Sequence, residues 1–269
     1  MTTTTRTTET RTALRAEHLT VRFGGLVAVN DVSFTVPEGG IVSMIGPNGA
    51  GKTTFFNVLT GLYELTAGRV YIGDRDITNL APHRIAALGV GRTFQNIRLF
   101  GLMTAEENVK VAMHSHLRSG VTATVLHTPR QRREEREARE TARELLDFVG
   151  IARAADEYAR NLSYGDQRRL EVARALAVRP SVLLLDEPTA GMNPRESARF
   201  TEFVHRVREA KKLSVLLIEH DMSVVMRVSE RITVLDHGER IAEGTPEQIR
   251  SDARVIEAYL GKAARERRL

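Results

Sequence analysis

Short apolar runs typical of β-strands alternate along the chain with stretches of helical pattern. The early runs follow one another through turns such as Gly-Gly and Pro-Glu-Gly-Gly, whereas helical segments separate the later ones. We therefore expect an antiparallel section joined to a mainly parallel sheet. The predicted strands are Ala16–Phe23, Asp31–Val36, Ile41–Ile45, Gly68–Ile72, Ser181–Leu185, Ser214–Ile218 and Ile232–Leu235.

The run Val182–Leu185 is apolar at every position rather than at alternate positions. This pattern is typical of a strand that is buried on both faces, as in a parallel sheet covered by helices. A chain of 269 residues is long enough for one large domain with a smaller lobe. The pattern thus predicts an α/β fold.

Between about Asn96 and Val178 helical patterns replace the strand patterns, which predicts a helical subdomain over about residues 96–178. Residues 130–140 are nearly all charged and lead into apolar positions at Leu145 and Leu146. We expect a solvated helix whose far end docks on the body of the domain. Opposite charges lie four positions apart on it and can pair: Glu135 with Arg139, and Arg136 with Glu140.

The two ends of the chain differ from the folded part. Residues 1–13 are rich in Thr and Arg, cannot bury apolar surface, and are expected to be disordered. The predicted domain spans residues 14–261, and a basic tail follows over residues 262–269.

Composition excludes several classes of protein. The chain has no cysteine, which rules out disulfides, thiol nucleophiles and zinc–thiolate sites. No run approaches about 18 apolar residues, and the N-terminus lacks a secretory signal, so we expect a cytoplasmic protein. The net charge of +5 comes from interspersed acids and bases with few aromatic residues, which argues against nucleic-acid binding. Attraction to an anionic membrane face or to phosphates explains the excess equally well.

The segment Gly46–Thr53 fits the phosphate-loop pattern at every fixed position, and it lies between a predicted strand and a predicted helix. Its glycines let successive N–H groups turn toward phosphate oxygens. Lys52 is expected to reach the β- and γ-phosphates, and the Thr53 hydroxyl to ligate Mg²⁺. A chance glycine-rich turn is the alternative, and the strand–helix context disfavours it. The predicted nucleotide contacts are Gly46, Pro47, Asn48, Gly49, Ala50, Gly51, Lys52, Thr53 and Thr54.

Two strand ends carry further chemistry. Asp186 and Glu187 follow the buried strand, where Asp186 can hold Mg²⁺ and Glu187 can polarise a water for attack on the γ-phosphate. Surface acids at the end of a strand are the plainer interpretation. His220 ends the next strand, a position where a histidine alone is usually a surface or capping residue. Ser163 and Gly165 begin a helix, either as a simple N-cap or as a second anion site.

The phosphate loop, the segment Leu162–Asp166, the strand end Asp186–Pro188 and His220 occur in one order and at matching spacing. Together they resemble the ATP-binding-cassette (ABC) ATPases, over about Ala16 to Gly261. The resemblance implies a P-loop NTPase fold with a mainly parallel core sheet, an antiparallel section and a helical subdomain. It also implies ATP and Mg²⁺ as cofactors and ATP hydrolysis coupled to membrane transport.

In this family two domains pack head to tail and enclose two ATP molecules. By resemblance, Ser163 and Gly165 then contact the γ-phosphate bound by the other subunit, and Phe23 stacks on adenine unless it is a core residue. Gln95 matches the loop glutamine that reaches Mg²⁺ and senses the membrane partner. His220 matches the histidine that binds the γ-phosphate, and Glu187 matches the general base.

Two positions depart from the commonest pattern of the family. Asp166 stands where Gln is usual, and an acid facing a phosphate is unfavourable, so its side chain is expected to point away or to cap the helix. Asn193 stands where many relatives have Asp, which puts coupling between subunits through that loop in doubt. Tyr164 is a familiar variant in one branch.

Four segments and the charged insertion between His114 and Glu144 resemble the larger, LivG-type ATPase subunit of branched-chain amino-acid importers. Urea or amide importers and the lipopolysaccharide-export ATPase are the alternatives. This branch implies permease subunits, a second ATPase subunit (a copy or a paralogue) and an extracytoplasmic substrate-binding protein, with the chain on the inner face of the cell membrane. The segments are Phe23–Asn30, Arg92–Phe100, Ala190–Pro194 and Ile256–Gly261.

Two other classes of protein fit the sequence less well. A soluble ABC ATPase acting on ribosomes or DNA usually has two fused cassettes or a long coiled coil, and the chain shows neither. A regulator that no longer hydrolyses ATP is disfavoured because Glu187 and His220 are both present.

Overall fold

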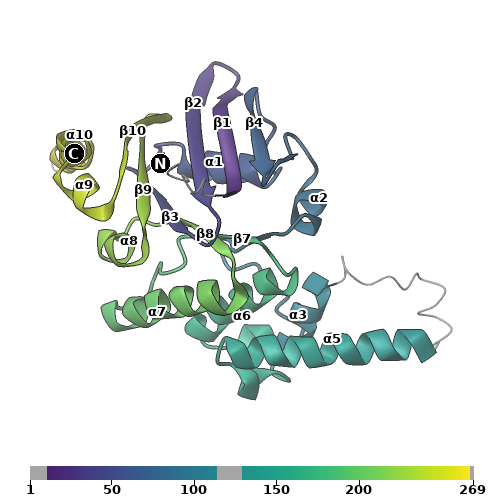
Figure 1. The fold of residues 1–269 in the computed structure, drawn as a ribbon. Helices are drawn as coiled ribbons and strands as arrows, with labels where there is room; N and C mark the ends of the chain where they lie inside the picture. Colours follow the sequence, from purple (N-terminus) through teal and green to yellow (C-terminus); the bar gives the residue numbers. More distant parts are fainter. Residues whose placement is uncertain (1–10, 114–128, 267–269) are drawn as a thin grey trace, which may run out of the picture.

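The computed structural model describes residues 11–113 and 129–266, and it consists of two sheets with helices packed around them (Figure 1). The strands are β1 (Thr12–Phe23), β2 (Leu26–Pro37), β3 (Ile41–Ile45), β4 (Ala67–Ile72), β5 (Arg75–Asp76), β6 (Val90–Arg92), β7 (Val182–Asp186), β8 (Ser214–Ile218), β9 (Arg231–Asp236) and β10 (Glu239–Gly244). The helices are α1 (Lys52–Leu59), α2 (Pro82–Ala87), α3 (Ala105–Met113), α5 (Pro129–Phe148), α6 (Tyr164–Ala177), α7 (Pro194–Lys211), α8 (Met222–Val228), α9 (Pro246–Ser251) and α10 (Ala253–Glu266), with single turns η2 (Ala152–Ala154) and η3 (Ala159–Asn161).

The larger sheet has the order β10-β9-β3-β8-β7-β6 and is parallel from β9 to β6, with β10 antiparallel at its edge. The smaller sheet, β2-β1-β4-β5, is antiparallel throughout. The predicted α/β fold with a parallel core and an antiparallel section is confirmed. The strands β5, β6 and β10 were not predicted, because they are short or polar and lie at or near sheet edges.

The strands β3, β7 and β8 are buried at every residue, as the apolar run in β7 predicts. Alternate residues of β7 point to opposite faces of the sheet. Leu184 joins the core between the two sheets and α1, where Phe34 packs against Phe55. Leu183 and Leu185 join the core on the other face, which α6 and α7 cover. The parallel sheet is therefore held between two apolar layers, and its strand ends form a rigid edge.

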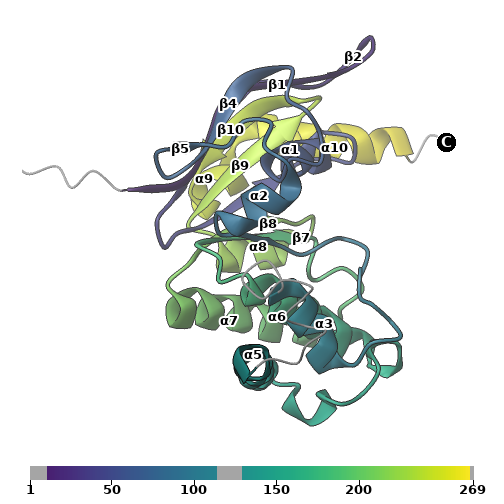
Figure 2. The ribbon, with the colours of Figure 1, turned by 90° about the vertical axis from the view of Figure 1, so that its right-hand side faces the viewer.

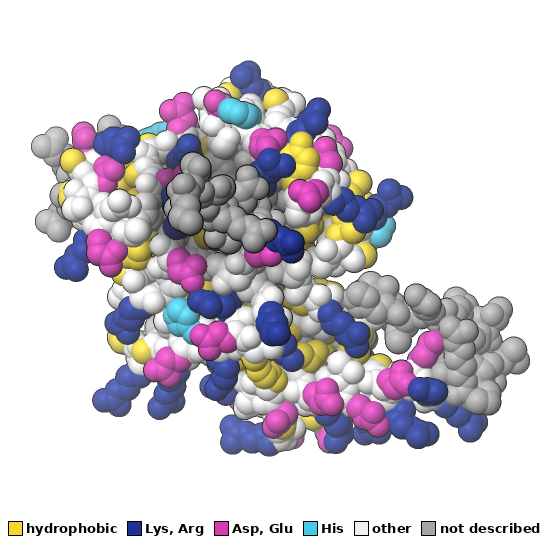
Figure 3. Space-filling model, in the orientation of Figure 1, with side chains coloured by type: hydrophobic (Ala, Val, Ile, Leu, Met, Phe, Trp, Pro, Cys, Tyr) yellow, Lys and Arg dark blue, Asp and Glu magenta, His cyan; other side chains and the backbone are white. Residues whose placement is uncertain are grey.

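Helices α3, α5 and α6 pack against one another and form a helical lobe below the sheets (Figures 1 and 2). The far end of α5 docks through buried Leu145 and Leu146, as expected. Figure 3 shows acidic and basic side chains interspersed along its outer face.

The predicted ion pair between Glu135 and Arg139 is wrong. Glu135 instead pairs with Lys110 of α3, and Arg139 pairs with Glu106 of α3 at 3.2 Å. The tertiary partners prevail because Glu106 is buried and takes cations from α5, with Arg143 as the second at 2.6 Å.

Both predicted domain boundaries differ from the structure. Strand β1 begins at Thr12, which pairs with Pro37, so the folded part starts before residue 14. Helix α10 continues to Glu266, beyond the predicted boundary at residue 261. Residues 1–10, 267–269 and the part of the charged insertion over 114–128 lie outside the described residues. Within the described parts of the chain, no helix combines the length and apolar character that a membrane span requires.

Candidate nucleotide-binding site

The phosphate loop lies between β3 and α1, and two of its glycines cannot be replaced without a clash. Gly46 has a φ of 152°, and a Cβ there would lie 2.1 Å from the carbonyl oxygen of Leu235. Gly51 has a φ of 99°, and its Cβ would lie 2.5 Å from the carbonyl oxygen of Ala28. Neighbouring strands thus press against the loop from outside, which fixes the curl that turns its inner face toward a ligand.

Lys52 is the first residue of α1 and is 7 % exposed. Its Nζ donates to the carbonyl oxygens of Gly46, at 2.7 Å, and Pro47, at 3.0 Å. The ammonium is therefore held inside the loop by weak neutral acceptors. Phosphate oxygens are stronger acceptors for this cation, and exchanging the carbonyls for them is favourable.

The other residues predicted to contact the nucleotide lie in the same loop or at the start of α1, and they differ in burial. Ala50 is buried, and Thr54 is partly buried at the start of α1. The exposed members face solvent at the mouth of the loop: Asn48, Gly49 and Thr53.

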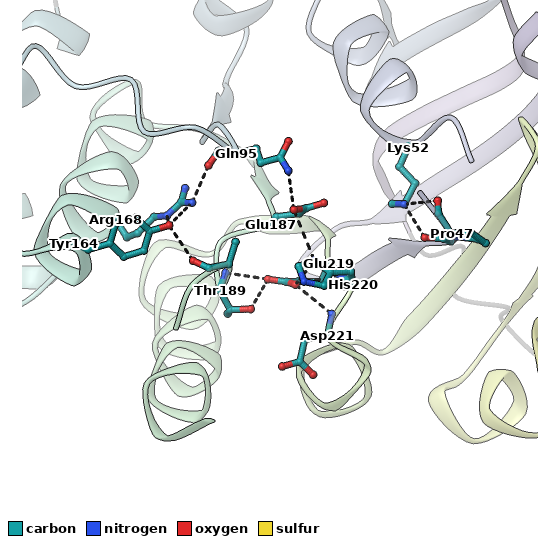
Figure 4. A network of polar contacts seen from close by, with 12 residues as sticks. Pro47, Lys52, Gln95, Tyr164, Arg168, Glu187, Thr189, Glu219, His220 and Asp221 are labelled. Carbon is teal, nitrogen blue, oxygen red and sulfur yellow. Dashed lines mark hydrogen bonds and ion pairs between the residues drawn. The ribbon is translucent and has the colours of Figure 1, made fainter. Parts of the chain in front are cut away.

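Three predicted catalytic residues converge beside the loop (Figure 4). Gln95 donates from Nε2 to Oε2 of Glu187 at 2.9 Å. His220 lies with Nδ1 3.7 Å from the same carboxylate oxygen. Segments far apart in the sequence, at the ends of β6, β7 and β8, therefore bring an amide, a carboxylate and an imidazole within reach of one reacting group.

Glu187 adopts a left-handed backbone, with a φ of 45°. This conformation is unfavourable for a residue with a Cβ and marks a constrained position. Its N–H donates to the carbonyl oxygen of Ile218 at 2.9 Å, which ties the turn after β7 to the end of β8. The sharp turn separates its carboxylate from that of Asp186, which remains buried at 3 % exposure.

Asp186 forms a buried ion pair with Arg92, which the sequence did not single out. Arg92 NH2 lies 2.9 Å from Asp186 Oδ2, and both side chains are less than 10 % exposed. Burial lowers the pKa of Arg92. The hydrogen bond with Asp186 and the charge of that carboxylate act in the opposite direction. The same guanidinium donates to the Thr60 hydroxyl at 2.7 Å. Arg92 therefore anchors the carboxylate predicted to hold Mg²⁺ to the helix that follows the phosphate loop.

Glu219 is a second residue that sequence reasoning missed. Its side chain is fully buried and accepts hydrogen bonds from the N–H of Thr189 at 2.9 Å and from the Thr189 hydroxyl at 2.5 Å. It also accepts from the N–H of His220 at 3.1 Å. Glu219 thus fixes His220 relative to the segment that follows Glu187. Its place just before His220 was the only signal in the sequence.

The segment around Ser163 begins α6 and lies in the lobe opposite α1 in both ribbon views (Figures 1 and 2). Ser163 caps α6 by accepting from the N–H of Asp166 at 3.2 Å, as the capping interpretation predicts. Gly165 is exposed, and a Cβ added there meets no atom within 4 Å. The structure therefore does not bring Ser163 and Gly165 to the phosphate loop of the same chain.

Two further residues that the sequence analysis singled out are Phe23 and Asn193. Phe23 is 46 % exposed and contacts Tyr63 edge to face at 5.3 Å, so the alternative of a core residue is wrong. Asn193 caps α7 and forms a capping box with Glu196. An asparagine in place of aspartate keeps this cap intact.

The donor set fits a shared Mg²⁺ site. Among residues 11–113 and 129–266, no group of three or more His, Asp or Glu side chains is arranged to hold a metal ion by itself. Mg²⁺ usually takes only one or two protein oxygens and completes its shell with substrate phosphates and waters. The Thr53 hydroxyl and the Asp186 carboxylate, beside a phosphate loop, are donors of that kind.

A mainly apolar groove of about 530 Å³ opens next to the Gln95 loop, between the sheet part and the helical lobe. Arg92, Phe94 and Glu171 also line it. Burial raises the pKa of Glu171, while the N–H of Arg98 and the charge of Arg168 lower it. The apolar wall residues include Pro82, Ile85, Val90, Phe100 and Val178.

Comparison with known proteins gives a consistent result. Residues 29–190 match the family described as ABC transporter, and residues 239–265 match one described as branched-chain amino acid ATP-binding cassette transporter. The chain is 51 % identical to the branched-chain amino acid transport ATP-binding protein BraF of Pseudomonas aeruginosa, over 94 % of this chain and 99 % of BraF. It is 48 % identical to LivG of Escherichia coli, over 93 % and 98 %.

Solved structures agree with this assignment. An ATP-binding cassette of an ABC transporter in its ADP conformation is similar with a TM-score of 0.81 and 32 % identity, over 93 % of this chain and 99 % of that one. A dimeric cassette bound to ADP and Pi has a TM-score of 0.73 and 28 % identity, over 87 % and 98 %. The chain belongs to the ABC transporter family, as one of its ATP-binding, ATP-hydrolysing subunits.

Proposed function

We propose that this chain binds and hydrolyses Mg·ATP to drive import of branched-chain amino acids through membrane permease subunits. The observation that carries the hydrolytic part is the cluster of Gln95, Glu187 and His220 at the end of the parallel sheet. A carboxylate held between an amide donor and an imidazole can orient and polarise a water for in-line attack.

We assign the roles as follows. Lys52 and the loop N–H groups hold the β- and γ-phosphates, and Phe23 provides an exposed ring for adenine. Thr53, Asp186 and Gln95 hold Mg²⁺, which when bound neutralises phosphate charge. Glu187 accepts a proton from the attacking water, and His220 steadies the γ-phosphate.

We also propose a head-to-tail pair of cassettes. Ser163 and Gly165 are exposed and lie away from their own phosphate loop, so they are available to the nucleotide of a second subunit. The dimeric relative supports such a pairing. The second subunit is a copy of this chain or a paralogue.

The substrate class rests on the relatives. Identity to the branched-chain amino acid transport proteins is 48–51 %, against 36 % to the lipopolysaccharide export ATPase LptB of Haemophilus influenzae. We infer that the chain works at the cytoplasmic face of a membrane with permease subunits and an extracytoplasmic substrate-binding protein. The apolar groove beside the Gln95 loop is a suitable seat for a permease segment, because such a segment would contact the loop directly.

ATP hydrolysis by the purified protein and by Glu187→Gln tests this function. We expect the variant to lose hydrolysis about 10²- to 10⁴-fold, the usual contribution of a general base, and to accumulate as an ATP-bound dimer. Glu209→Gln, an equal change at an exposed position of α7, is the control and should keep the wild-type rate. Equal rates for Glu187→Gln and wild type would refute the assigned base.

The transport assignment needs the assembled importer. Uptake of labelled leucine by membranes containing the permease subunits should depend on this chain and fail with Glu187→Gln. Uptake of urea instead, with no leucine transport, would move the substrate assignment to the amide importers.

A further inference from the structure

Arg168, in the first turns of α6, uses its guanidinium to join separate parts of the site. The side chain is 4 % exposed. NH1 donates to the carbonyl oxygen of Phe94 at 2.9 Å, and NH2 donates to that of Gln95 at 2.7 Å. An ion pair of 3.2 Å with Glu171 balances the buried charge. Two successive carbonyls of the Gln95 loop are therefore fixed to the start of α6.

The same guanidinium holds the Tyr164 hydroxyl, with Nε at 3.1 Å and NH2 at 2.8 Å. Since that hydroxyl accepts from Arg168, its own proton is available to a third group. It donates to the carbonyl oxygen of Ala190 at 2.9 Å. Ala190 lies three residues after Glu187 in the turn that begins with Glu187.

These contacts form a closed ring that passes through Gln95 and the turn of Glu187 (Figure 4). On one side Gln95 reaches Glu187 through its side chain, and on the other Tyr164 reaches the turn that follows Glu187. Arg168 connects the two sides. Its fork spans two carbonyls and a hydroxyl in fixed directions, a geometry that a lysine ammonium cannot match.

We propose that Arg168 and Tyr164 form a positioning pair that sets where Gln95 lies relative to Glu187, and that makes the Gln95 loop and the Ser163–Gly165 segment move as one body. Neither residue contacts the reacting atoms. The inference rests on the proposed ATP hydrolysis and deepens it. In a head-to-tail dimer, the segment contacting the partner's nucleotide is thereby mechanically tied to the loop that serves the chain's own nucleotide.

Steady-state ATP hydrolysis by Tyr164→Phe, Arg168→Gln and the double variant tests the pair. We expect kcat to fall about 5- to 10-fold for Tyr164→Phe and about 30-fold for Arg168→Gln, with the KM for ATP changed less than about 3-fold, because orientation rather than binding is lost. The double variant should be no slower than Arg168→Gln, since residues that act as one unit are not additive. Arg168→Lys should recover little activity.

Arg169→Gln is the matched control, because Arg169 is adjacent and exposed, and its hydrogen bond within the described residues is a long one, 3.4 Å to the carbonyl oxygen of Gly150. Tyr164 is 46 % exposed, so Tyr164→Phe should fold even if Arg168→Gln does not. An unchanged kcat in Tyr164→Phe would overturn the pair, as would effects that multiply in the double variant. Absence of hydrolysis in both wild type and Arg169→Gln would overturn the proposed function, and the pair with it.

Discussion

The phosphate loop and the Ser163–Gly165 segment both contain glycine and both lead into a helix, yet the first is enclosed by neighbouring strands and the second is open to solvent. Around the loop, neighbouring strands leave no room for a Cβ at Gly46, and Lys52 is enclosed. At Gly165 the space is open, and the segment faces solvent. The phosphate loop is thus enclosed by its own chain, whereas the Ser163–Gly165 segment is open on the side that we propose for the nucleotide of a second subunit.

Gly46→Ala should have the largest effect. The new Cβ would lie 2.1 Å from the Leu235 carbonyl oxygen, and a φ of 152° strains any side chain. We expect a loss of more than about 5 kcal/mol in the free energy of unfolding and no measurable ATP binding, because the backbone clash and the strain add. Denaturant unfolding with isothermal titration of ATP measures both. A stable variant that binds ATP would remove the contrast between the two turns.

Arg92→Met should be next, with a loss of about 3–5 kcal/mol, because it leaves the Asp186 carboxylate buried without its cation. The control is Arg133→Met, which breaks an exposed pair with Glu137 and should leave the unfolding temperature unchanged. Thermal unfolding of both variants checks the difference. Similar losses would mean that Asp186 does not depend on Arg92.

Ser163→Ala removes the cap of α6 and should cost about 1 kcal/mol in the free energy of unfolding. If Ser163 also binds the partner's nucleotide, the rate of ATP hydrolysis will fall by more than the small loss of stability can explain. Ser163→Asp keeps a capping side chain but adds a negative charge, so it should restore stability and not hydrolysis. Recovery of both would reduce Ser163 to a helix cap.

Gly165→Ala should have the smallest effect on stability, within about 0.5 kcal/mol, because the added methyl meets no atom within 4 Å and alanine is compatible with a helix. Hydrolysis should nevertheless fall, since the added methyl occupies the open side of the segment. Normal hydrolysis together with normal stability would show that this side contacts no partner.

Elements with a regular apolar pattern could be predicted from the sequence. The strands around Val182–Leu185 and Ser214–Ile218 are recognisable as continuous apolar runs, because both of their faces are buried. The edge strand Glu239–Gly244 could not be recognised, since its polar residues resemble those of a loop. In α5, sequence spacing predicted Glu135–Arg139, but Glu135 paired with Lys110 on another helix. Local spacing says nothing about such partners.

The candidate site shows the same limit. The motifs identified Gln95, Glu187 and His220, and the structure adds that they lie together. Arg92, Arg168 and Glu219 were missed, because a charged residue reads as exposed unless its partner is known. Arg92 meets Asp186 94 positions later along the chain, so its burial is decided by the packing of β6 beside β7.

The left-handed backbone at Glu187 has a consequence for engineering and selection. Glycine adopts that conformation without strain, but it also loses more conformational freedom on folding, so Glu187→Gly should change the free energy of unfolding by less than about 1 kcal/mol while removing the proposed base. A screen for heat resistance alone would therefore not distinguish glutamate from glycine at this position, whereas a screen for ATP hydrolysis should. Folding thus gives little reason to prefer glutamate over glycine at this dihedral angle, and we infer that its proposed role in hydrolysis accounts for the side chain.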